Sequence, residues 1–541
     1  MASVVADCLV ENGKVFLGPG LGFAEAVAIW QGRVLATGTS AELQGLVGAT
    51  TRRADLAGRL AVPGLNDAHQ HMMSVGLGTL EVNLKRDDIR TIDDILAAVK
   101  EKADALGPGA WVMGRGYDHF ELDVRRHPLR EELDQIAPDN PVYIKRTCGH
   151  MGVANSKALE LAGIVEGIAQ PDGGHVESQN GKLTGLLKET AQQLVYKAFP
   201  KASLGDFVDG IEAGARLNLS FGITSTTDPA VGLREGFKDW QAYLSARRQA
   251  RLPQRMYLMP LAGGTGWPEK IVDMNLMTGD GDEWLKVGPM KLFADGSAGG
   301  KTAAMFEPYA DDEENKGIFI YSDEDLHGMI QDYHARGFQI ATHAIGDAAI
   351  EQVLVGYERA LGNAVDQDRR HRIEHCGFLT DGQLERMAQA GILPAPQPIF
   401  LYEFGDLYIS ALGHGRPEKS YPMRRWQDAG LYPSGSSDGP VSDTNPFKSI
   451  YSMVTRKTSK GTILGADEAL TMEEAIGAYT VNSAYGAFEE GLKGTLEIGK
   501  LGDIAVLDTD LFTKEPEAWL LTQADLTILG GEVVYDRLGQ M

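Results

Sequence analysis

Residues 61–71 have the sequence Ala61-Val-Pro-Gly-Leu-Asn-Asp-Ala-His-Gln-His71. The apolar start and the Pro-Gly pair predict a short buried strand that ends just before two histidines. Residues i and i+2 of a strand face the same side, so His69 and His71 can bind one metal ion. Taken alone, the pair fits two partly exposed polar residues at a strand end better than a metal site. The metal is favoured only if further ligand types occur at other strand ends.

Strand-like runs alternate with helical patterns through the middle of the chain, which is typical of βα units and a parallel sheet. Eight such runs are expected, at 60–65, 222–228, 254–259, 290–295, 339–343, 371–375, 392–396 and 431–435. Eight parallel strands predict an α/β fold of the (β/α)8 TIM-type barrel class. In that fold the active site lies at the C-terminal ends of the strands.

Both ends of the chain and one long internal segment lie outside this pattern. Neither end has enough strands for a sheet of its own, so both are expected to form one small β-sandwich at 1–61 and 489–541. The barrel then occupies 62–80 and 206–488. Roughly 140 residues separate its first two strands, where a βα loop normally takes a handful. They predict an inserted subdomain at 81–205, over the active-site mouth.

The composition limits the partners of the chain. Its 75 acidic and 51 basic residues give a formal charge of −24, which disfavours nucleic acid and anionic membranes. Cys8, Cys148 and Cys376 support neither a disulfide framework nor a cysteine-based zinc site. The chain shows no secretory signal pattern and no apolar stretch of about 20 residues. We expect a cytoplasmic homodimer that acts on a small-molecule substrate.

Six residues with metal-binding chemistry lie at or just past the predicted strand ends: His69, His71, Lys291, His343, His375 and Asp438. Twelve histidines placed at random would seldom put four at strand ends on one face. Imidazoles bind zinc and similar metals, and an open coordination position lowers the pKa of bound water to about 7. A metal hydroxide is the expected nucleophile. Asp438 can accept its proton and deliver it to the leaving group.

Lys291 differs from the other five, since an ammonium group beside two cations would be repelled. Reaction with carbon dioxide would turn it into an anionic carboxylate able to bridge two metal ions. A salt bridge from Lys291 to Asp295 or another acid is the alternative. The chemistry of the residues alone favours that alternative slightly.

The six residues, flanked by a split β-sandwich, resemble the two-metal form of the amidohydrolase superfamily. Four segments narrow the resemblance to its YtcJ-like branch, which includes N-substituted formamide deformylase. They are Met290-Lys-Leu-Phe-Ala-Asp-Gly-Ser297, Thr342-His-Ala-Ile-Gly-Asp347, Arg372-Ile-Glu-His375, and Gly149-His150 followed by Asn155-Ser156. The resemblance covers nearly the whole chain. Gly439 departs from it, because branch members often carry a larger residue there.

The resemblance implies roles for the six residues and two divalent metal ions, most often zinc, as cofactors. His69, His71 and Asp438 hold one ion. His343 and His375 hold the other, and N6-carboxylated Lys291 bridges the two. A hydroxide between the metals attacks the substrate carbonyl, and Asp438 acts as general base and then as general acid.

The insertion contains two candidate substrate-binding residues, Tyr117 and His150. Tyr117 follows an apolar run in Gly114-Arg-Gly-Tyr-Asp118, and His150 has a similar setting in Cys148-Gly-His150. Either could hold a substrate or stabilise a tetrahedral oxyanion. A purely structural role for these polar side chains fits equally well.

The function favoured by these residues is hydrolysis of the C–N bond of a non-peptide amide, such as an N-substituted formamide or an N-acyl amine. A hydrolase of carbamates, cyclic amides or esters would use the same machinery. A deaminase of the superfamily would carry a glutamate at position 346, where this chain has glycine, and Lys291 also counts against it. A non-catalytic binding protein is disfavoured because all six predicted ligands are present.

Overall fold

The computed structural model describes residues 4–85, 88–147, 149–263, 267–362 and 368–539. The chain forms two compact units, one of Met1–Gly76 with Phe207–Met541 and one of Leu77–Asp206. Cys148 lies outside the described residues, and Cys8 and Cys376 are buried thiols. Among the described residues, no helix is long and apolar enough to cross a membrane.

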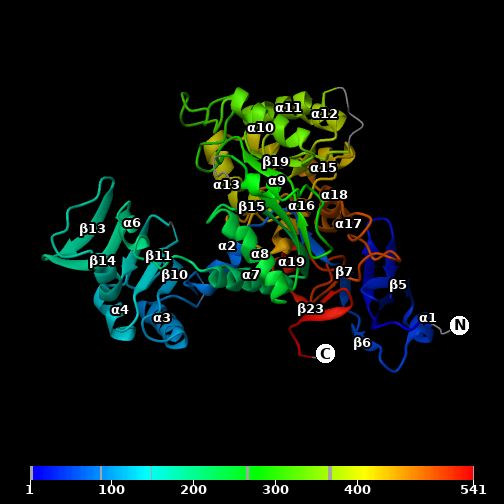
Figure 1. The fold of residues 1–541 in the computed structure, drawn as a ribbon, viewed down its shortest axis with the longest axis horizontal. Coiled ribbons are helices and arrows are strands. Elements are labelled where there is room, and N and C mark those ends of the chain that lie inside the picture. Colours follow the sequence, from blue (N-terminus) through cyan, green and yellow to red (C-terminus); the bar gives the residue numbers. More distant parts are fainter. Residues whose placement is uncertain (1–3, 86–87, 148, 264–266, 363–367, 540–541) are drawn as a thin grey trace. The chain divides into compact units, whose positions relative to one another are not determined.

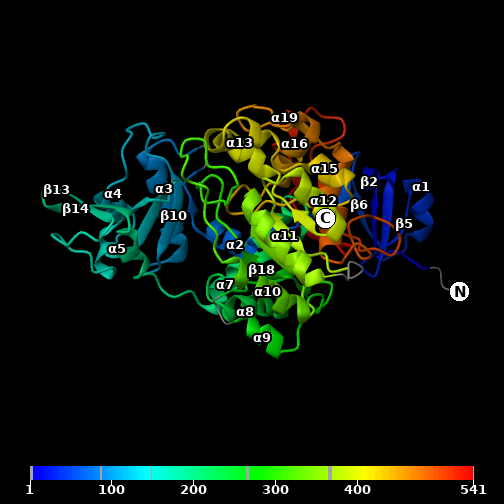
Figure 2. The same cartoon turned by 90° about the horizontal axis from the view of Figure 1, so that it is seen from above.

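Two four-stranded parallel sheets lie in the larger unit (Figures 1 and 2). Their strand orders are β17-β16-β15-β8 and β18-β19-β20-β21, and every neighbouring pair is parallel. All nine residues of β15 are buried, as expected for a strand covered on both faces. The predicted α/β fold is confirmed. The strands are β8 Leu65–Asp67, β15 Ile223–Val231, β16 Arg255–Pro260, β17 Leu285–Val287, β18 Met290–Phe293, β19 Ile340–Ala344, β20 Arg372–His375 and β21 Leu393–Ala395.

Two of the eight predicted strands need correction. The first is divided at Gly64: Leu60–Pro63 forms β7 of another sheet, and only Leu65–Asp67 pairs with β15. The eighth, at 431–435, is wrong because no strand forms there. Pro433 has no N–H to donate, and the N–H of Gly435 binds the carbonyl oxygen of Ala478 instead of a neighbouring strand.

Helices alternate with these strands along the chain, and local sequence signals mark their ends. α10 begins after Ser322, whose hydroxyl accepts the N–H of Asp325. α12 begins with a capping box of Thr380 and Gln383 and ends at Gly391 in the left-handed conformation. The helices outside the smaller unit, including two that cross its ends, are α1 Ser40–Leu43, α2 Met72–Leu80, α7 Leu204–Leu219, α8 Phe237–Arg248, α9 Pro268–Asp273, α10 Asp323–Ala335, α11 Asp347–Leu361, α12 Asp381–Ala390, α13 Ile399–Leu412, α14 Gly415–Glu418, α15 Met423–Asp428, α16 Pro446–Thr455, α17 Met472–Gly477, α18 Ser483–Gly486 and α19 Pro516–Trp519.

Both ends of the chain contribute to one six-stranded sheet, β24-β23-β22-β7-β2-β3, and a second sheet has the order β5-β4-β1-β6. The two sheets share a cluster of buried side chains that includes Val10, Val27, Ile504 and Ile528. This shared core joins residues about 500 positions apart in sequence by burying their apolar surface together. The strands are β1 Cys8–Glu11, β2 Lys14–Gly18, β3 Gly22–Ala24, β4 Ala26–Trp30, β5 Arg33–Gly38, β6 Arg52–Asp55, β7 Leu60–Pro63, β22 Ile504–Leu507, β23 Ala524–Leu529 and β24 Glu532–Asp536.

The smaller unit contains a six-stranded mixed sheet of order β13-β14-β12-β11-β10-β9. Its helices and strands pack around a core of buried side chains that includes Ile95, Val112, Leu133 and Ile144. The elements are β9 Val82–Asn83, α3 Ile92–Leu106, β10 Val112–Tyr117, α4 Arg130–Ile136, β11 Val142–Arg146, β12 Met151–Ala154, α5 Ser156–Leu161, β13 Gly174–Gln179, β14 Lys182–Glu189 and α6 Gln192–Tyr196.

Helix α2 begins directly after His71 and packs tightly on α7 through glycine. A Cβ added at Gly76 would lie 1.7 Å from the carbonyl oxygen of Gly210 and 2.5 Å from the backbone nitrogen of Gly214. Backbone atoms cannot move aside as a side chain can. The absence of a side chain at Gly76 therefore fixes the position of the helix that follows the two histidines.

We predict that Gly76→Ala destabilises the protein by about 1 to 3 kcal/mol, because the added methyl overpacks a backbone contact. Gly328→Ala is the matched control, since a Cβ at this position of α10 meets nothing within 4 Å. It should stabilise its helix by about 0.5 to 1 kcal/mol. Urea unfolding measures both. Equal effects of the two substitutions would contradict the prediction.

Candidate active site

Asp438 and two histidines converge just past the end of β8. The Nε2 atoms of His69 and His71 lie 3.4 Å and 3.3 Å from Oδ1 of Asp438. The backbones also pair, because Asp438 donates its N–H to the carbonyl oxygen of His69 at 2.7 Å. His375 arrives from the end of β20. One ligand atom from each of His69, His375 and Asp438 lies within 4.8 Å of the others.

The residues at this point fit a divalent metal ion. Oδ1 of Asp438 is buried and accepts no hydrogen bond, although a buried polar atom without a partner is costly. Burial alone would raise the pKa of Asp438, but the imidazoles of His69 and His71 hold it well below its usual value. Burial lowers the pKa of His375 far below its usual value, so that imidazole is neutral. Neutral imidazoles and an ionised carboxylate are ligands that zinc prefers.

Two of the histidines are oriented by partners on their other ring nitrogen. Nδ1 of His69 is hydrogen bonded to Glu374, whose two oxygens accept from Arg372 at 2.8 Å and 3.0 Å. Nδ1 of His375 is hydrogen bonded to Oε1 of Gln397. Such contacts fix the ring and leave Nε2 for a metal. Burial opposes ionisation of Glu374, but Arg372, His69 and Lys291 together hold its pKa below the usual value.

The backbone is strained at two of the candidate ligands. His375 has φ 68° and Asp438 has φ 57°, in the left-handed region that costs a non-glycine residue about 1 to 2 kcal/mol. Strict alternation along β20 would send Glu374 and His375 to opposite faces. The left-handed turn at His375 instead lets both side chains reach His69. Glu374 is hydrogen bonded to His69, and the ring centroids of His375 and His69 are 5.0 Å apart.

His343 lies beside this cluster, with its ring centroid 4.3 Å from that of His375. Its Nε2 donates to the carbonyl oxygen of Gly296 at 2.9 Å and lies 3.3 Å from Oδ1 of Asp295. A metal-binding role for His343 therefore falls to Nδ1, with Nε2 held by the backbone in the way that metal-binding histidines usually are.

Lys291 is buried, and burial lowers the pKa of its amine to about 8. Its Nζ lies 5.0 Å from the centre of the Phe293 ring. The alternative of a salt bridge to Asp295 is wrong. The carboxylate of Asp295 accepts the backbone N–H groups of Ala304, Ile345 and Gly346 instead. Within the part of the chain that the structure describes, Lys291 forms no ion pair.

The two candidate substrate-binding residues have different surroundings in the smaller unit. Tyr117 is fully buried in its core, and its hydroxyl is hydrogen bonded to Nδ1 of His127 at 2.9 Å. His150 is exposed and pairs with Glu189 at 2.9 Å. Burial gives Tyr117 a structural role here. Substrate binding by either residue stays a prediction.

Sequence reasoning missed four side chains that orient the candidate ligands: Asp67, Asp295, Glu374 and Gln397. Glu374 carried a signal, since Arg372 and Glu374 are charged residues spaced by two in a run that the sequence pattern predicts to be a buried strand. The other three carried none. Their contacts join segments up to 370 positions apart, as Asp67 and Ser437 show, and local patterns do not report such pairs.

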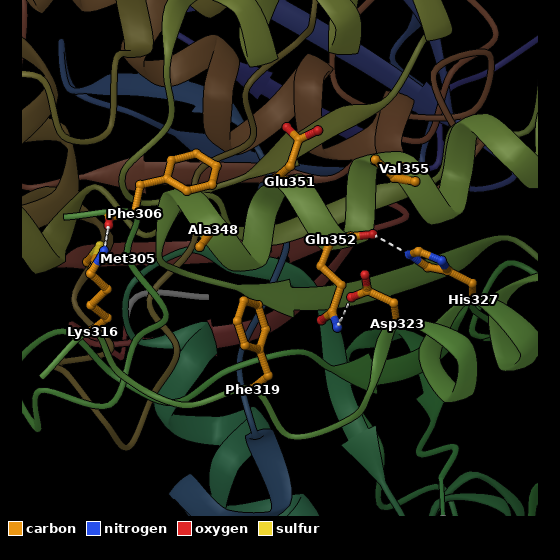
Figure 3. A pocket seen from close by; sticks show the side chains of 10 residues that line it. All are labelled: Met305, Phe306, Lys316, Phe319, Asp323, His327, Ala348, Glu351, Gln352 and Val355. Carbon is orange, nitrogen blue, oxygen red and sulfur yellow. Dashed lines mark hydrogen bonds between the residues drawn. The ribbon is translucent and has the colours of Figure 1, made fainter. Parts of the chain in front are cut away.

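A surface pocket of the larger unit lies between α10, α11 and the loop around Phe319 (Figure 3). None of the six predicted ligands lines it. Its polar groups bind one another: Gln352 donates to Asp323 at 2.8 Å, and His327 to the carbonyl oxygen of Gln352 at 2.8 Å. This pocket therefore contributes nothing to the candidate metal centre.

An α/β fold with a buried cluster of imidazoles and a carboxylate at its strand ends is that of a metal-dependent hydrolase. The amidohydrolase family model matches residues 53–535, and the chain belongs to this family. A crystal structure of an uncharacterized metal-dependent hydrolase from Pyrococcus furiosus is similar, with a TM-score of 0.74 and 26% identity over 93% of this chain and 99% of that one.

Curated relatives match over nearly the whole chain. The Arabidopsis thaliana protein LONG AFTER FAR-RED 3 is 33% identical over 99% of this chain and 92% of its own length. YtcJ of Bacillus subtilis strain 168 is 30% identical, and N-substituted formamide deformylase of Arthrobacter pascens is 28% identical. Each of these two covers 95% of this chain and 96% of the relative. The predicted membership of the YtcJ-like amidohydrolases is confirmed.

We predict that Glu374→Gln destabilises the metal-free protein by about 3 to 5 kcal/mol, because it leaves the Arg372 guanidinium buried without a counter-charge. Urea unfolding with a chelator present measures the loss. Glu532→Gln is the control, since Glu532 and its partner Arg52 are 66% and 44% exposed. An exposed pair contributes about 1 kcal/mol or less, and an equally small loss for Glu374→Gln would contradict the prediction.

Proposed function

We propose that this protein hydrolyses the C–N bond of a non-peptide amide. The observation that supports the proposal most is the convergence of His69, His375 and Asp438 within 4.8 Å around a carboxylate oxygen that has no hydrogen bond. The name of the N-substituted formamide deformylase, which is 28% identical, makes N-substituted formamides the first substrate class to test. N-acyl amines are the second.

We further infer that the two parallel sheets are parts of one (β/α)8 barrel. Leu261, just after β16, forms a parallel bridge with Lys291 of β18. β17 and β18 follow one another along the chain and both pair beside β16, so they count as one barrel strand. On the opposite side, Ala68 donates to the carbonyl oxygen of Gly435, and Ser436 to that of Pro396. Residues 431–438 thus lie between β8 and β21, where an eighth strand would close the barrel. The two sheets at the chain ends, within 1–61 and 489–541, would form the composite β-sandwich. The barrel would then occupy 62–80 and 206–488, and 81–205 would form the inserted subdomain.

The residues divide into two sets of metal ligands. His69, His71 and Asp438 would hold one ion, and His343 through Nδ1 and His375 through Nε2 would hold the other. A divalent metal such as zinc, when bound, lowers the pKa of water and polarises a carbonyl group.

Asp438 is suited to move the proton. Its pKa is held well below the usual value, so the carboxylate is ionised. An ionised carboxylate has oxygens that can accept a proton from the water that attacks the carbonyl carbon. Asp438 then delivers this proton to the amide nitrogen as the C–N bond breaks. One amide and one water give one carboxylic acid and one amine.

Lys291 would complete the centre as a carbamate. Its neutral amine adds to carbon dioxide, one N–C bond forms, and one proton leaves to solvent. The lowered pKa of about 8 favours this reaction, because about a tenth of such amines are neutral at pH 7. The product is an anion that can bind two cations, which an ammonium group cannot do.

We predict that metal-free protein incubated with ¹³C-bicarbonate shows a carbamate carbon signal in NMR spectra, and that Lys291→Met lacks it. The signal should weaken as the pH falls below about 8, because the amine becomes protonated and cannot add to carbon dioxide. A signal of equal strength in Lys291→Met would assign the carbamate to another amine and contradict the role of Lys291.

The function is tested by removing the metal with a chelator, reloading zinc, and screening amides, carbamates, cyclic amides and esters. We expect amide turnover only in the reloaded protein. Asp438→Asn should lower kcat by about 10²- to 10⁴-fold, the range for loss of acid–base catalysis. Full activity of the metal-free protein would overturn the proposal. No turnover of any substrate with metal bound would favour a binding protein instead.

A further inference from the structure

Asp67, the last residue of β8, receives four hydrogen bonds in a fully buried position. Oδ1 accepts the backbone N–H groups of His69 at 3.1 Å and Ser437 at 3.2 Å. Oδ2 accepts the hydroxyl of Ser437 at 2.6 Å and the side-chain amide of Gln70 at 3.3 Å. Asp67 itself is 0% exposed. One carboxylate thus bonds directly to the loop that carries His69 and to the loop that carries Asp438.

These two loops lie beyond the regular strands. β8 ends at Asp67, and residues 431–438 form no strand. The loops share three backbone hydrogen bonds, from Ala68 to Gly435 at 3.1 Å, from Asp438 to His69 at 2.7 Å and from His71 to Gly439 at 2.9 Å. The side-chain amide of Gln70 also donates to the hydroxyl of Ser437 at 3.4 Å. Asp67 adds the side-chain contacts that set the distance between them.

We propose that Asp67 is a positioning residue for the metal centre. It holds His69 and Asp438 at the separation at which both reach the same metal ion. This inference rests on the proposed function, since it presupposes that these two residues are metal ligands. Asp67 does not itself contact the reacting atoms.

The arrangement requires a carboxylate. The two backbone N–H groups and the NH₂ group of Gln70 can only donate, and the Ser437 hydroxyl reaches the same oxygen as Gln70. An ionised carboxylate accepts from all four, because it has two acceptor oxygens and no hydrogen. An asparagine would keep one oxygen and turn its NH₂ group against the NH₂ group of Gln70. The substitution therefore alters the contact between the loops with almost no change in volume.

Asp239 offers a matched control. It is also buried, at 1% exposed, and its carboxylate accepts the backbone N–H groups of Gly232, Arg234 and Glu235, each at 3.1 Å. None of these partners is a predicted metal ligand or its neighbour in sequence. Asp239→Asn therefore tests the general cost of changing a buried carboxylate.

The experiment measures Co²⁺ binding to chelator-treated protein at pH 8, by calorimetry and by the visible absorption of the bound ion. We expect Asp67→Asn to bind Co²⁺ about 10- to 100-fold more weakly than wild type, the usual effect of altering a contact that orients a ligand. Its absorption spectrum should change, because the ligand geometry changes. Asp239→Asn should match wild type in affinity and spectrum even if its Tm falls.

Ser437→Ala is the milder second variant, since it removes the hydroxyl and keeps the backbone contact to Asp67. We expect a smaller loss of Co²⁺ affinity in the same direction. Wild-type affinity and spectrum in folded Asp67→Asn or, should that variant not fold, in Ser437→Ala would overturn the inference alone. Failure of the wild-type protein to bind Co²⁺ would overturn the proposed function and this inference with it.

Discussion

The site depends on one buried carboxylate oxygen, Oδ1 of Asp438, which is surrounded by imidazole nitrogens and accepts no hydrogen bond. Folding a protein around such an atom costs free energy unless a cation completes its surroundings. The chain also accepts left-handed backbone at Asp438 itself and at His375. Two unfavourable features at one point, both involving candidate ligands, are what a site built for metal binding shows.

The surroundings of the ligands follow one rule. Three of the four candidate histidines use one ring nitrogen for a protein acceptor: Glu374 for His69, Gln397 for His375 and the Gly296 carbonyl for His343. Glu374 is itself balanced by Arg372. These three candidate ligands are thus held by other groups of the protein, so binding of a metal ion would not need to order them, and less of the binding energy would be lost to side-chain entropy.

The positions of the ligands along the chain could be predicted because strand ends and residue spacing are local properties. The segment 431–438 could not, because its path is set by backbone contacts to Ala68 and Ala478 rather than by its own apolar pattern. The left-handed turn at His375 could not be predicted either, because the residue types there do not specify that conformation. For Lys291, the chemistry of the residues alone slightly favoured a salt bridge with Asp295 or another acid. The structure shows that the carboxylate of Asp295 accepts three backbone N–H groups from other segments of the chain instead.

The contrast between local patterns and long-range contacts also explains why the sequence indicates the type of reaction more clearly than the substrate. The candidate residues for metal binding and proton transfer lie at strand ends of the larger unit. Substrate choice depends on the surfaces around them, where two aromatic rings stand next to the histidines: Phe293 lies 5.3 Å from His343, and Phe400 lies 6.0 Å from His375. Apolar rings favour apolar substituents by area and do little to discriminate among them, because one methylene against apolar side chains changes binding by only about 1 to 3 kcal/mol. Amides that differ only in apolar substituents should therefore be separated far less sharply than amides are separated from compounds that lack the carbonyl group.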